Sequence, residues 1–254
     1  MSNAVLGWRH AAREKLRAAP VRRAILIPAF EEALRLGDVL RRVAEHSPDF
    51  DVVVVDDGSS DATAAVAADA GARVLRHPFN LGYGAALQTG YKYAWRAGVE
   101  LLVQLDADGQ HDPADARALL EPVERGELDL VIGSRFLGAG AYRMGALRGV
   151  GRVLFQRALR AFGLCVTDPT SGFQAMNRAV LELYTGDAFP TDYPDVDVLL
   201  AAYREGLRVG ERPVTMAQSV RVSSLHSGWA PIYYVYKMML SVWAASAGWA
   251  RPPR

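Results

Sequence analysis

Short apolar runs alternate with longer amphipathic stretches over the first half of the chain. A strand covered by helices on both faces is apolar throughout, and the runs that fit this description are Ala24–Pro28, Asp51–Val55, Arg73–Leu75, Leu101–Leu105 and Leu128–Gly133. Helical patterns fill the intervals, up to about Glu45 and then over Asp61–Ala70, Ala85–Arg96 and Pro113–Arg125. Strands that alternate with helices predict an α/β fold with a doubly wound, mostly parallel sheet and right-handed crossovers.

The second half of the chain follows a different pattern, which begins with the Gly- and Arg-rich segment Gly138–Gly151. Helical periodicity returns over Val153–Phe162 and Val196–Arg204, with a turn-rich loop over Asp168–Phe173 between them. Arg208–Met216 is expected to be a late strand. We interpret these segments as the second half of the same domain.

The predicted domain spans residues 21–230, and both ends of the chain lie outside it. Residues 1–20 form a short, basic, helix-prone extension, and residues 231–254 form an amphipathic tail rich in Tyr and Trp. Such segments suit the headgroup region of a membrane, whereas a frayed terminal helix or a packed core helix explains them about equally well. No run reaches the ~18 uncharged apolar residues of a membrane span, so we expect peripheral membrane contact at most.

Charge and cysteine content narrow the class of protein. The chain has 254 residues and a formal net charge of +1, so it lacks the basic surface of a nucleic-acid-binding protein. Cys165 is the single cysteine, which excludes an internal disulfide and a Cys cluster for zinc or iron–sulfur. No secretory signal is visible. We therefore expect a cytoplasmic location, at or near the inner face of the membrane, with no nucleic-acid partner; the sequence leaves the oligomeric state open.

Two carboxylates, Asp106 and Asp108, follow the fourth predicted strand with one small residue between them. Open α/β sheets bind their ligands at the edge where parallel strands end. Asp106 and Asp108 can face one divalent cation together, because Mg²⁺ or Mn²⁺ prefers oxygen ligands, usually alongside phosphate oxygens of a substrate. The alternative is a solvated loop, since Asp and Gly favour turns. The presence of further polar motifs at other strand ends favours the metal site.

The second strand is followed by Asp57, whose carboxylate can accept hydrogen bonds from a nucleobase or a ribose. Ser60 and Asp61 are expected to cap the helix that comes next. Gly82 lies in the segment Asn80-Leu81-Gly82-Tyr83-Gly84, where glycine lets the backbone approach a ligand closely, although a plain loop is the favoured interpretation of that segment alone.

Basic and acidic residues in the second half of the chain are weaker candidates for substrate binding and catalysis. Arg135 ends the fifth strand and is a candidate fork for a phosphate, and Arg148 follows it in a basic run that a solvated surface also explains. Asp168 lies in a turn and can anchor backbone N–H groups or contact a substrate. Asp195 or Asp197 can serve as a general base or simply cap the helix that follows.

Together these segments resemble glycosyltransferase family 2, the inverting enzymes that have the GT-A nucleotide-diphospho-sugar transferase fold. The similarity covers roughly residues 22–230 and follows the family order through Pro28-Ala29-Phe30-Glu31-Glu32, Asp56–Asp61, Asn80–Gly84, Asp106–His111, Gly133–Arg135 and Asp168–Phe173. Each motif is modest, but their shared order is a strong signal. The branch that the chain resembles most is that of the dolichol-phosphate mannose synthases, which transfer a sugar to a polyprenyl phosphate.

The resemblance implies a role for each matching residue. The donor, a GDP- or UDP-sugar, would be bound by Pro28, Ala29, Phe30, Glu31, Asp57, Gly82, Asp106, Ala107 and Asp108. The divalent metal would be held by Asp106, Asp108 and Gln110. The acceptor would meet Arg135, Arg148, Ser171 and Ser224, in the second half of the domain. The residues implied in catalysis are Asp108, Arg135, Arg148 and Asp197.

The acceptor decides what the site must do. A phosphate oxygen is ionised at neutral pH and attacks unaided, whereas a sugar hydroxyl needs a carboxylate to take its proton. Transfer to a polyprenyl phosphate is the favoured function, and transfer to a hydroxyl of a glycan or cell-wall precursor is the alternative. A non-catalytic nucleotide-binding or scaffold protein is a third hypothesis, against which the intact Asp106 and Asp108 argue.

Overall fold

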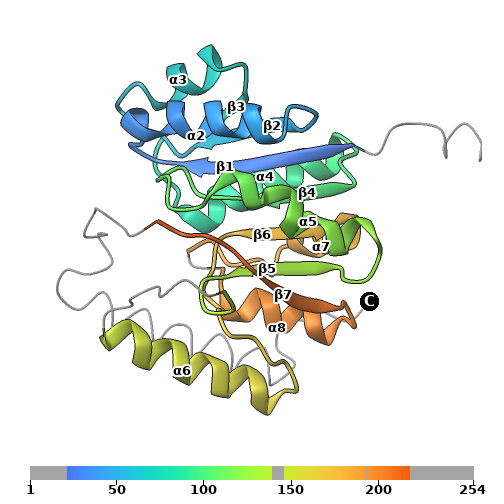
Figure 1. Ribbon diagram of the computed structural model, residues 1–254. Helices are drawn as coiled ribbons and strands as arrows, with labels where there is room; N and C mark the ends of the chain where they lie inside the picture. Colours follow the sequence, from blue (N-terminus) through green and yellow to red (C-terminus); the bar gives the residue numbers. More distant parts are fainter. Residues whose placement is uncertain (1–21, 139–145, 193, 218–254) are drawn as a thin grey trace, which may run out of the picture.

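A mixed seven-stranded sheet with helices on both faces organises the chain (Figure 1). The computed structural model describes residues 22–138, 146–192 and 194–217. The strands in chain order are β1 (Arg23–Ala29), β2 (Asp51–Asp56), β3 (Arg73–Arg76), β4 (Leu101–Gln104), β5 (Leu130–Ser134), β6 (Gln174–Asn177) and β7 (Val209–Pro213). Their order across the sheet is β3-β2-β1-β4-β6-β5-β7, with β6 antiparallel to both neighbours. The mostly parallel α/β sheet predicted from the sequence is confirmed.

Helices connect the strands and cover the sheet. They are α2 (Ala33–His46), α3 (Thr63–Asp69), α4 (Tyr83–Arg96), a short 3₁₀ turn η1 (Pro113–Asp115), α5 (Ala116–Glu124), α6 (Ala146–Ala161), α7 (Arg178–Tyr184) and α8 (Val196–Arg204). In α2 the apolar residues Leu36, Val39, Leu40 and Val43 recur at helical spacing and are buried, which is the pattern of a helix with one face on a core.

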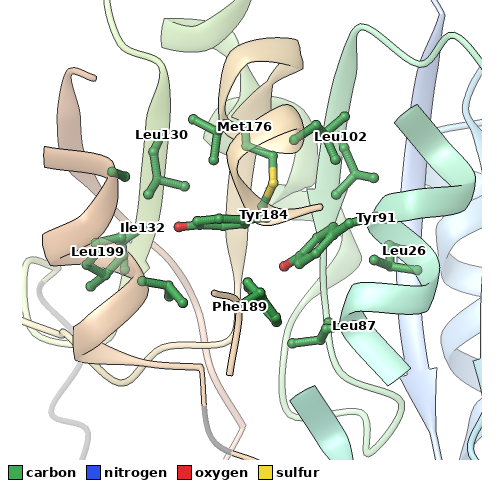
Figure 2. Packing of buried hydrophobic residues seen from close by; sticks show 14 of the residues in the cluster. Leu26, Leu87, Tyr91, Leu102, Leu130, Ile132, Met176, Tyr184, Phe189 and Leu199 are labelled. Carbon is green, nitrogen blue, oxygen red and sulfur yellow. The ribbon is translucent and has the colours of Figure 1, made fainter. Parts of the chain in front are cut away.

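The hydrophobic core has one layer on each face of the sheet. Residues of α2, α3 and α5 pack on one face, and residues of α4, α6, α7 and α8 pack on the other. Figure 2 shows the centre of the second layer, where the rings of Tyr91, Tyr184 and Phe189 meet with centroids 5.4–5.6 Å apart. Aromatic rings at such distances and tilts add to the stabilisation from burial.

The parallel pairing of the central strands brings their C-terminal ends to one edge. Ala29 of β1 lies opposite Asp56 of β2, and Leu26 of β1 lies opposite Gln104 of β4. The backbone N–H of Leu105 extends the second pairing by donating to the Leu26 carbonyl at 3.1 Å. The residues that follow these strands therefore emerge side by side, as ligand-binding residues of open α/β sheets do.

The sequence pattern missed β6 and α7. The four residues of β6, Gln174–Asn177, include no β-branched side chain and carry no strand signal. They form a strand because Ala175 and Met176 are fully buried between β4 and β5. The helix predicted from Val153 begins earlier, at Ala146, because glycines within that stretch are tolerated in a helix at a modest cost.

Candidate active site

Asp106 and Asp108 lie in a tight loop after β4. The backbone N–H of Asp106 donates to Nδ1 of His111 at 3.0 Å, and the backbone N–H of Gln110 donates to Oδ1 of Asp108 at 2.9 Å. Gly109 turns the chain with φ of +76°, a conformation that glycine adopts without strain. These bonds fold the loop back on itself and hold both carboxylates at the edge of the sheet.

The two carboxylates are poorly solvated and repel each other. Burial raises the pKa of Asp106, and burial together with the negative charge of Asp106 raises the pKa of Asp108. A divalent cation between the two groups would relieve that repulsion. The side chains present thus fit a Mg²⁺ or Mn²⁺ ion, and the ion would take its remaining ligands from substrate phosphates, as Mg²⁺ sites with one or two carboxylates do.

Gln110 contacts Asp108 in the same loop. Its side-chain amide N–H donates to Oδ2 of Asp108, and its amide oxygen accepts no hydrogen bond within the described ranges. Nowhere in the described residues do three His, Cys, Asp or Glu side chains gather as a ready cation cage. A site built from two carboxylates and an amide oxygen would therefore depend on the donor's phosphates for its affinity.

The buried ring of His111 supports the loop from the interior of the protein. Its ring is 2% exposed and stacks on Phe173 with centroids 5.0 Å apart. Burial lowers the pKa of His111 to about 4, so the ring is neutral and its Nδ1 can accept the hydrogen bond from Asp106. His111 also pairs in an isolated bridge with Met216, which draws the segment after β7 across the loop.

Asp57 holds the loop that precedes α4. Its Oδ1 and Oδ2 accept hydrogen bonds from the backbone N–H groups of Leu81 and Gly82, both at 2.9 Å. His77 approaches Oδ1 through Nδ1 at 2.7 Å, and its Nε2 lies 2.9 Å from the Thr89 hydroxyl. Asp57 thus has a structural task that the sequence did not indicate, and its contact with a base stays a prediction.

The turn after β1 carries backbone strain. Glu31 has φ of +57°, rare for a residue other than glycine and often found at functional sites. Its backbone N–H donates to the Ser59 hydroxyl at 3.0 Å, and its carboxylate accepts from both the N–H and hydroxyl of Ser60 at 2.8 Å. The capping role predicted for Ser60 is wrong. Ser60 donates its hydrogen bonds to Glu31, and the N-cap residue of α3 is Ala62. Phe30, beside this turn, is 45% exposed at the same edge.

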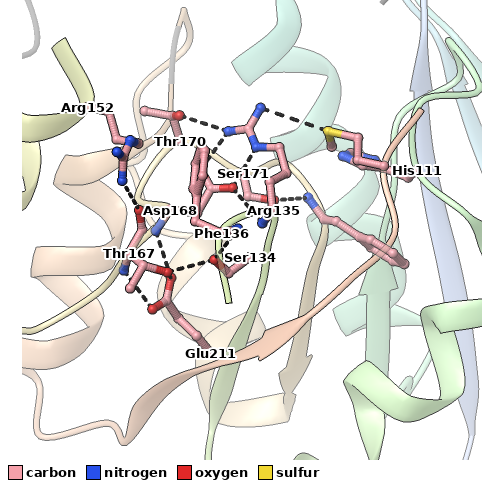
Figure 3. Close-up of polar contacts among 12 residues, drawn as sticks. His111, Ser134, Arg135, Phe136, Arg152, Thr167, Asp168, Thr170, Ser171 and Glu211 are labelled. Carbon is pink, nitrogen blue, oxygen red and sulfur yellow. Dashed lines mark hydrogen bonds and ion pairs between the residues drawn. The ribbon is translucent and has the colours of Figure 1, made fainter. Parts of the chain in front are cut away.

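Arg135 is paired with Asp168 at the end of β5 (Figure 3). Its Nε and Nη2 donate to the two carboxylate oxygens at 2.6 Å each, and Nη2 also donates to the Thr170 hydroxyl at 3.2 Å. Asp168 is fully buried, and Glu211 of β7 accepts from the N–H groups of Thr167 and Asp168. The fork expected to meet a phosphate is therefore used within the chain, through a partner that the sequence did not identify.

Asp195 and Asp197 face different surroundings. Burial raises the pKa of Tyr83, a residue that contacts Asp106, and the negative charges of Asp106 and Asp195 add to that rise. Burial and then the charge of Asp197 raise the pKa of Tyr184, in the core, and burial raises the pKa of Asp197 itself to about 6. The two carboxylates therefore act electrostatically on different tyrosines.

The remaining predicted residues fall into three groups. Pro28, Ala29 and Ala107 line the strand ends beside Asp57 and Asp106. Ser171 is 2% exposed and its hydroxyl accepts from the N–H of Phe173 at 3.3 Å, so it shapes the loop around Gly172. The side chain of Arg148 and the whole of Ser224 lie outside the described part of the chain.

A pocket of about 370 Å³ opens beside Asp108 on the α2 side of the loop. Leu34, Arg35, Asp38, Val39 and Arg42 line it from α2, opposite Asp108, Gly109, His111 and Pro113. Arg35 is paired with Glu32 and Arg42 with Asp112, at 3.0 and 2.6 Å. The aspartate loop is therefore reachable from this side as well as from the sheet edge.

Sequence comparison identifies the chain. A family model described as Glycosyl transferase family 2 matches residues 24–184. The chain belongs to this family. It is therefore a glycosyltransferase, and the expectation that it is an enzyme is confirmed, while the hypothesis of a non-catalytic scaffold protein is set aside.

Named relatives share most of their length with this glycosyltransferase. A polyprenol monophosphomannose synthase of Mycolicibacterium smegmatis is 31% identical, over 76% of this chain and 77% of its own. An undecaprenyl-phosphate mannosyltransferase of Micrococcus luteus is 33% identical, over 80% of this chain and 86% of its own. The expected similarity to polyprenyl-phosphate sugar transferases is confirmed.

Solved structures confirm the GT-A-like fold. Glucosyl-3-phosphoglycerate synthase from Mycobacterium tuberculosis, in complex with Mn²⁺, UDP-glucose and phosphoglyceric acid, superposes with a TM-score of 0.70 at 22% identity. The alignment covers 88% of this chain and 80% of that one. At this identity the likeness concerns the fold.

Proposed function

We propose that this glycosyltransferase moves a sugar from a nucleotide-diphospho-sugar to a polyprenyl phosphate, in one metal-dependent displacement with inversion. The observation that carries the proposal is the pair Asp106 and Asp108, whose pKa values are raised together at the C-terminal edge of the sheet. The names of the relatives support the lipid phosphate as acceptor. The donor base and sugar stay open, since another relative, 27% identical, is named for UDP-N-acetylglucosamine.

Different residues of the chain would bind the metal and the nucleotide of the donor. Asp106, Asp108 and Gln110 would hold a Mg²⁺ or Mn²⁺ ion, which would supply Lewis-acid stabilisation of the charge on the departing nucleoside diphosphate. Pro28 to Glu31, together with Gly82, would surround the nucleotide at the strand ends. Fixing donor and acceptor in this orientation supplies much of the rate, because it removes the entropy cost of bringing them together.

The acceptor needs a base only if it is a hydroxyl. A phosphate oxygen carries its charge at neutral pH, so neither Asp195 nor Asp197 would be required for transfer to a polyprenyl phosphate. Transfer to a glycan hydroxyl is the second candidate, favoured by the negative charge of Asp195, which acts on Tyr83, the residue hydrogen-bonded to Asp106. If Asp195→Asn and Asp197→Asn both retain near-normal turnover, the glycan version is refuted.

The experiment that tests the function is a transfer screen. GDP- and UDP-sugars are incubated with the full chain, short polyprenyl phosphates or glycans, and Mn²⁺ or Mg²⁺, and product is followed by mass. We expect glycolipid product that disappears when the metal is chelated. Product on glycans alone would replace the lipid proposal with the second candidate, and turnover that survives chelation would refute the metal role.

Membrane contact would bring the enzyme to a lipid acceptor. No helix within the described ranges is long and apolar enough to cross a bilayer. We propose peripheral binding at the inner face of the cell membrane through residues 1–20 and 231–254, which lie outside the described residues. Co-sedimentation with anionic liposomes should be weaker for a 1–230 truncation than for the full chain. Equal binding would exclude the C-terminal segment as an anchor.

A further inference from the structure

Tyr83 is the first residue of α4, and its hydroxyl reaches the aspartate loop. The phenol O–H donates to Oδ1 of Asp106 at 2.8 Å. The same oxygen accepts a hydrogen bond from Nε2 of Gln104, the last residue of β4, at 3.1 Å. The side chain is 36% exposed, so part of it borders the site entrance while its hydroxyl is engaged.

The hydrogen bonds of Tyr91 and Gln104 determine where the hydroxyl proton of Tyr83 points. Tyr91, one percent exposed in the core, donates its O–H to the amide oxygen of Gln104. That bond orients the Gln104 amide, so its N–H points to the Tyr83 oxygen. A phenol has a single proton, and with its oxygen already accepting from Gln104 the proton is directed to Asp106. Tyr91, Gln104, Tyr83 and Asp106 thus form a one-way chain, which we name the tyrosine relay.

Asp106 is confined from its other side by Gly172. A Cβ on Gly172 would lie 2.9 Å from Oδ2 of Asp106 and 3.0 Å from the Tyr83 hydroxyl. Only glycine lets the backbone come this close. The carboxylate is therefore fixed between the relay at Oδ1 and the Gly172 backbone at Oδ2, and its rotation is restricted.

The start of α4 is itself held in place. Asp57 accepts the N–H groups of Leu81 and Gly82, and the N–H of Gly84 donates to the Asp192 carbonyl at 3.2 Å. The backbone on both sides of Tyr83 is thus attached to the end of β2 and to the segment before α8. These contacts restrict the movement of Tyr83, and a residue that positions a metal ligand must be restricted in this way.

We propose that Tyr83, directed by Gln104 and Tyr91, is a positioning residue that holds Asp106 in the orientation in which it meets the divalent metal. The proposal rests on the proposed metal role of Asp106. Tyr83 acts through Asp106 and touches neither the metal nor the sugar. Removing a group that hydrogen-bonds to a metal ligand typically lowers the metal affinity on the order of 10-fold or more.

The test is the Mn²⁺ dependence of nucleotide binding in the full chain. Calorimetric titrations with GDP and with UDP at several Mn²⁺ concentrations give the Mn²⁺ needed for half-maximal binding. Tyr83→Phe removes one oxygen and should raise that concentration on the order of 10-fold. The control is Tyr93→Phe in the same helix, where the described contacts give the hydroxyl no hydrogen bond; it should match the wild type.

A second variant separates positioning from folding. Tyr91→Phe lies in the core, away from the site, and frees the Gln104 amide to turn over, so it should raise the Mn²⁺ requirement in the same direction by a smaller factor. In turnover assays, Tyr83→Phe should raise the KM for Mn²⁺ with kcat nearly unchanged, because the lost contact acts equally in ground and transition states.

The outcomes distinguish this inference from the proposed function. A wild type whose nucleotide binding is indifferent to Mn²⁺ refutes the metal role of Asp106 and the inference together. A wild type that requires Mn²⁺ while Tyr83→Phe requires the same concentration, or while Tyr93→Phe shows an equal rise, refutes the inference alone. A fall in kcat without change in the Mn²⁺ requirement also overturns it.

Discussion

Replacing Asp197 by Asn should stabilise the protein at neutral and alkaline pH. Burial raises the pKa of this carboxyl from 3.8 to about 6, so the folded protein binds its proton more tightly than the unfolded chain does. Stability is then lost as the pH rises from about 4 to about 6 and stays lower above that window. Asparagine never ionises, and its oxygen can still accept the bonds from the Asp195 and Val198 N–H groups.

The size of the effect follows from the shift. The difference of 6 − 3.8, about 2.2 units, corresponds to about 3 kcal/mol above pH 7. The ionised carboxylate near the N-terminus of α8 regains about 0.5 kcal/mol from the helix dipole, which leaves a net gain of about 2.5 kcal/mol for Asp197→Asn. For a chain of this length the gain corresponds to a rise in Tm of roughly 5 °C.

Thermal unfolding by circular dichroism at pH 8 and pH 5 measures this. The gain for Asp197→Asn should be full at pH 8 and about half as large at pH 5, where the unfolded chain has lost the proton and the folded one has kept it. Asp187→Asn, at an exposed aspartate after α7, is the control and should change neither Tm. A variant that is destabilised at pH 8, or stabilised equally at both pH values, would refute the assignment of Asp197 as a partly buried carboxyl with a raised pKa.

Three further substitutions test the site and the core. Asp108→Asn should lower metal-dependent transfer by about 100-fold or more, since it removes a charged ligand from the proposed ion, as initial rates across a Mn²⁺ series would show. Arg135→Lys should destabilise the fold by about 3 kcal/mol in urea unfolding, because a lysine cannot satisfy both oxygens of the buried Asp168; an unchanged midpoint would contradict the paired fork. Gly90→Ala should cost about 1–3 kcal/mol in the same assay, since its Cβ would lie 2.2 Å from a methyl of the buried Leu26.

The sequence was most informative where local chemistry and periodicity agree. Buried parallel strands are apolar throughout, so β1, β2 and β4 could be placed from composition alone, and the residues after them followed. The strand β6 could not, because what makes Gln174–Asn177 a strand is its place between two other strands. Such long-range pairing leaves no mark in a four-residue segment.

The hydrogen-bond partners of the site residues could not be predicted from the sequence either. The sequence singled out Arg135 and Asp57 by their positions at strand ends, but Asp168 lies 33 residues beyond Arg135 and the loop held by Asp57 lies 24 residues beyond it. The segment that contains Tyr83 is a plain loop by its sequence pattern, whereas in the structure Tyr83 is the first residue of α4. The flanking Gly82 and Gly84 pack closely against the backbone of Pro190 and Thr191, and this long-range contact could not be predicted from the local sequence.

The proposed donor and acceptor sides of the site are held by different contacts, and this difference would affect which acceptor is preferred. At the donor side, Asp57 and the tyrosine relay fix backbone and carboxylate with hydrogen bonds to buried partners, so the nucleotide would meet a preformed surface. At the proposed acceptor side, the guanidinium of Arg135 is bound to Asp168, whose backbone N–H donates to Glu211 of β7. A phosphate that contacts Arg135 would therefore share it with Asp168 and meet less than its full charge. Acceptor affinity would then depend on additional contacts, such as a lipid chain against apolar surface, which favours an amphiphilic phosphate over a free one.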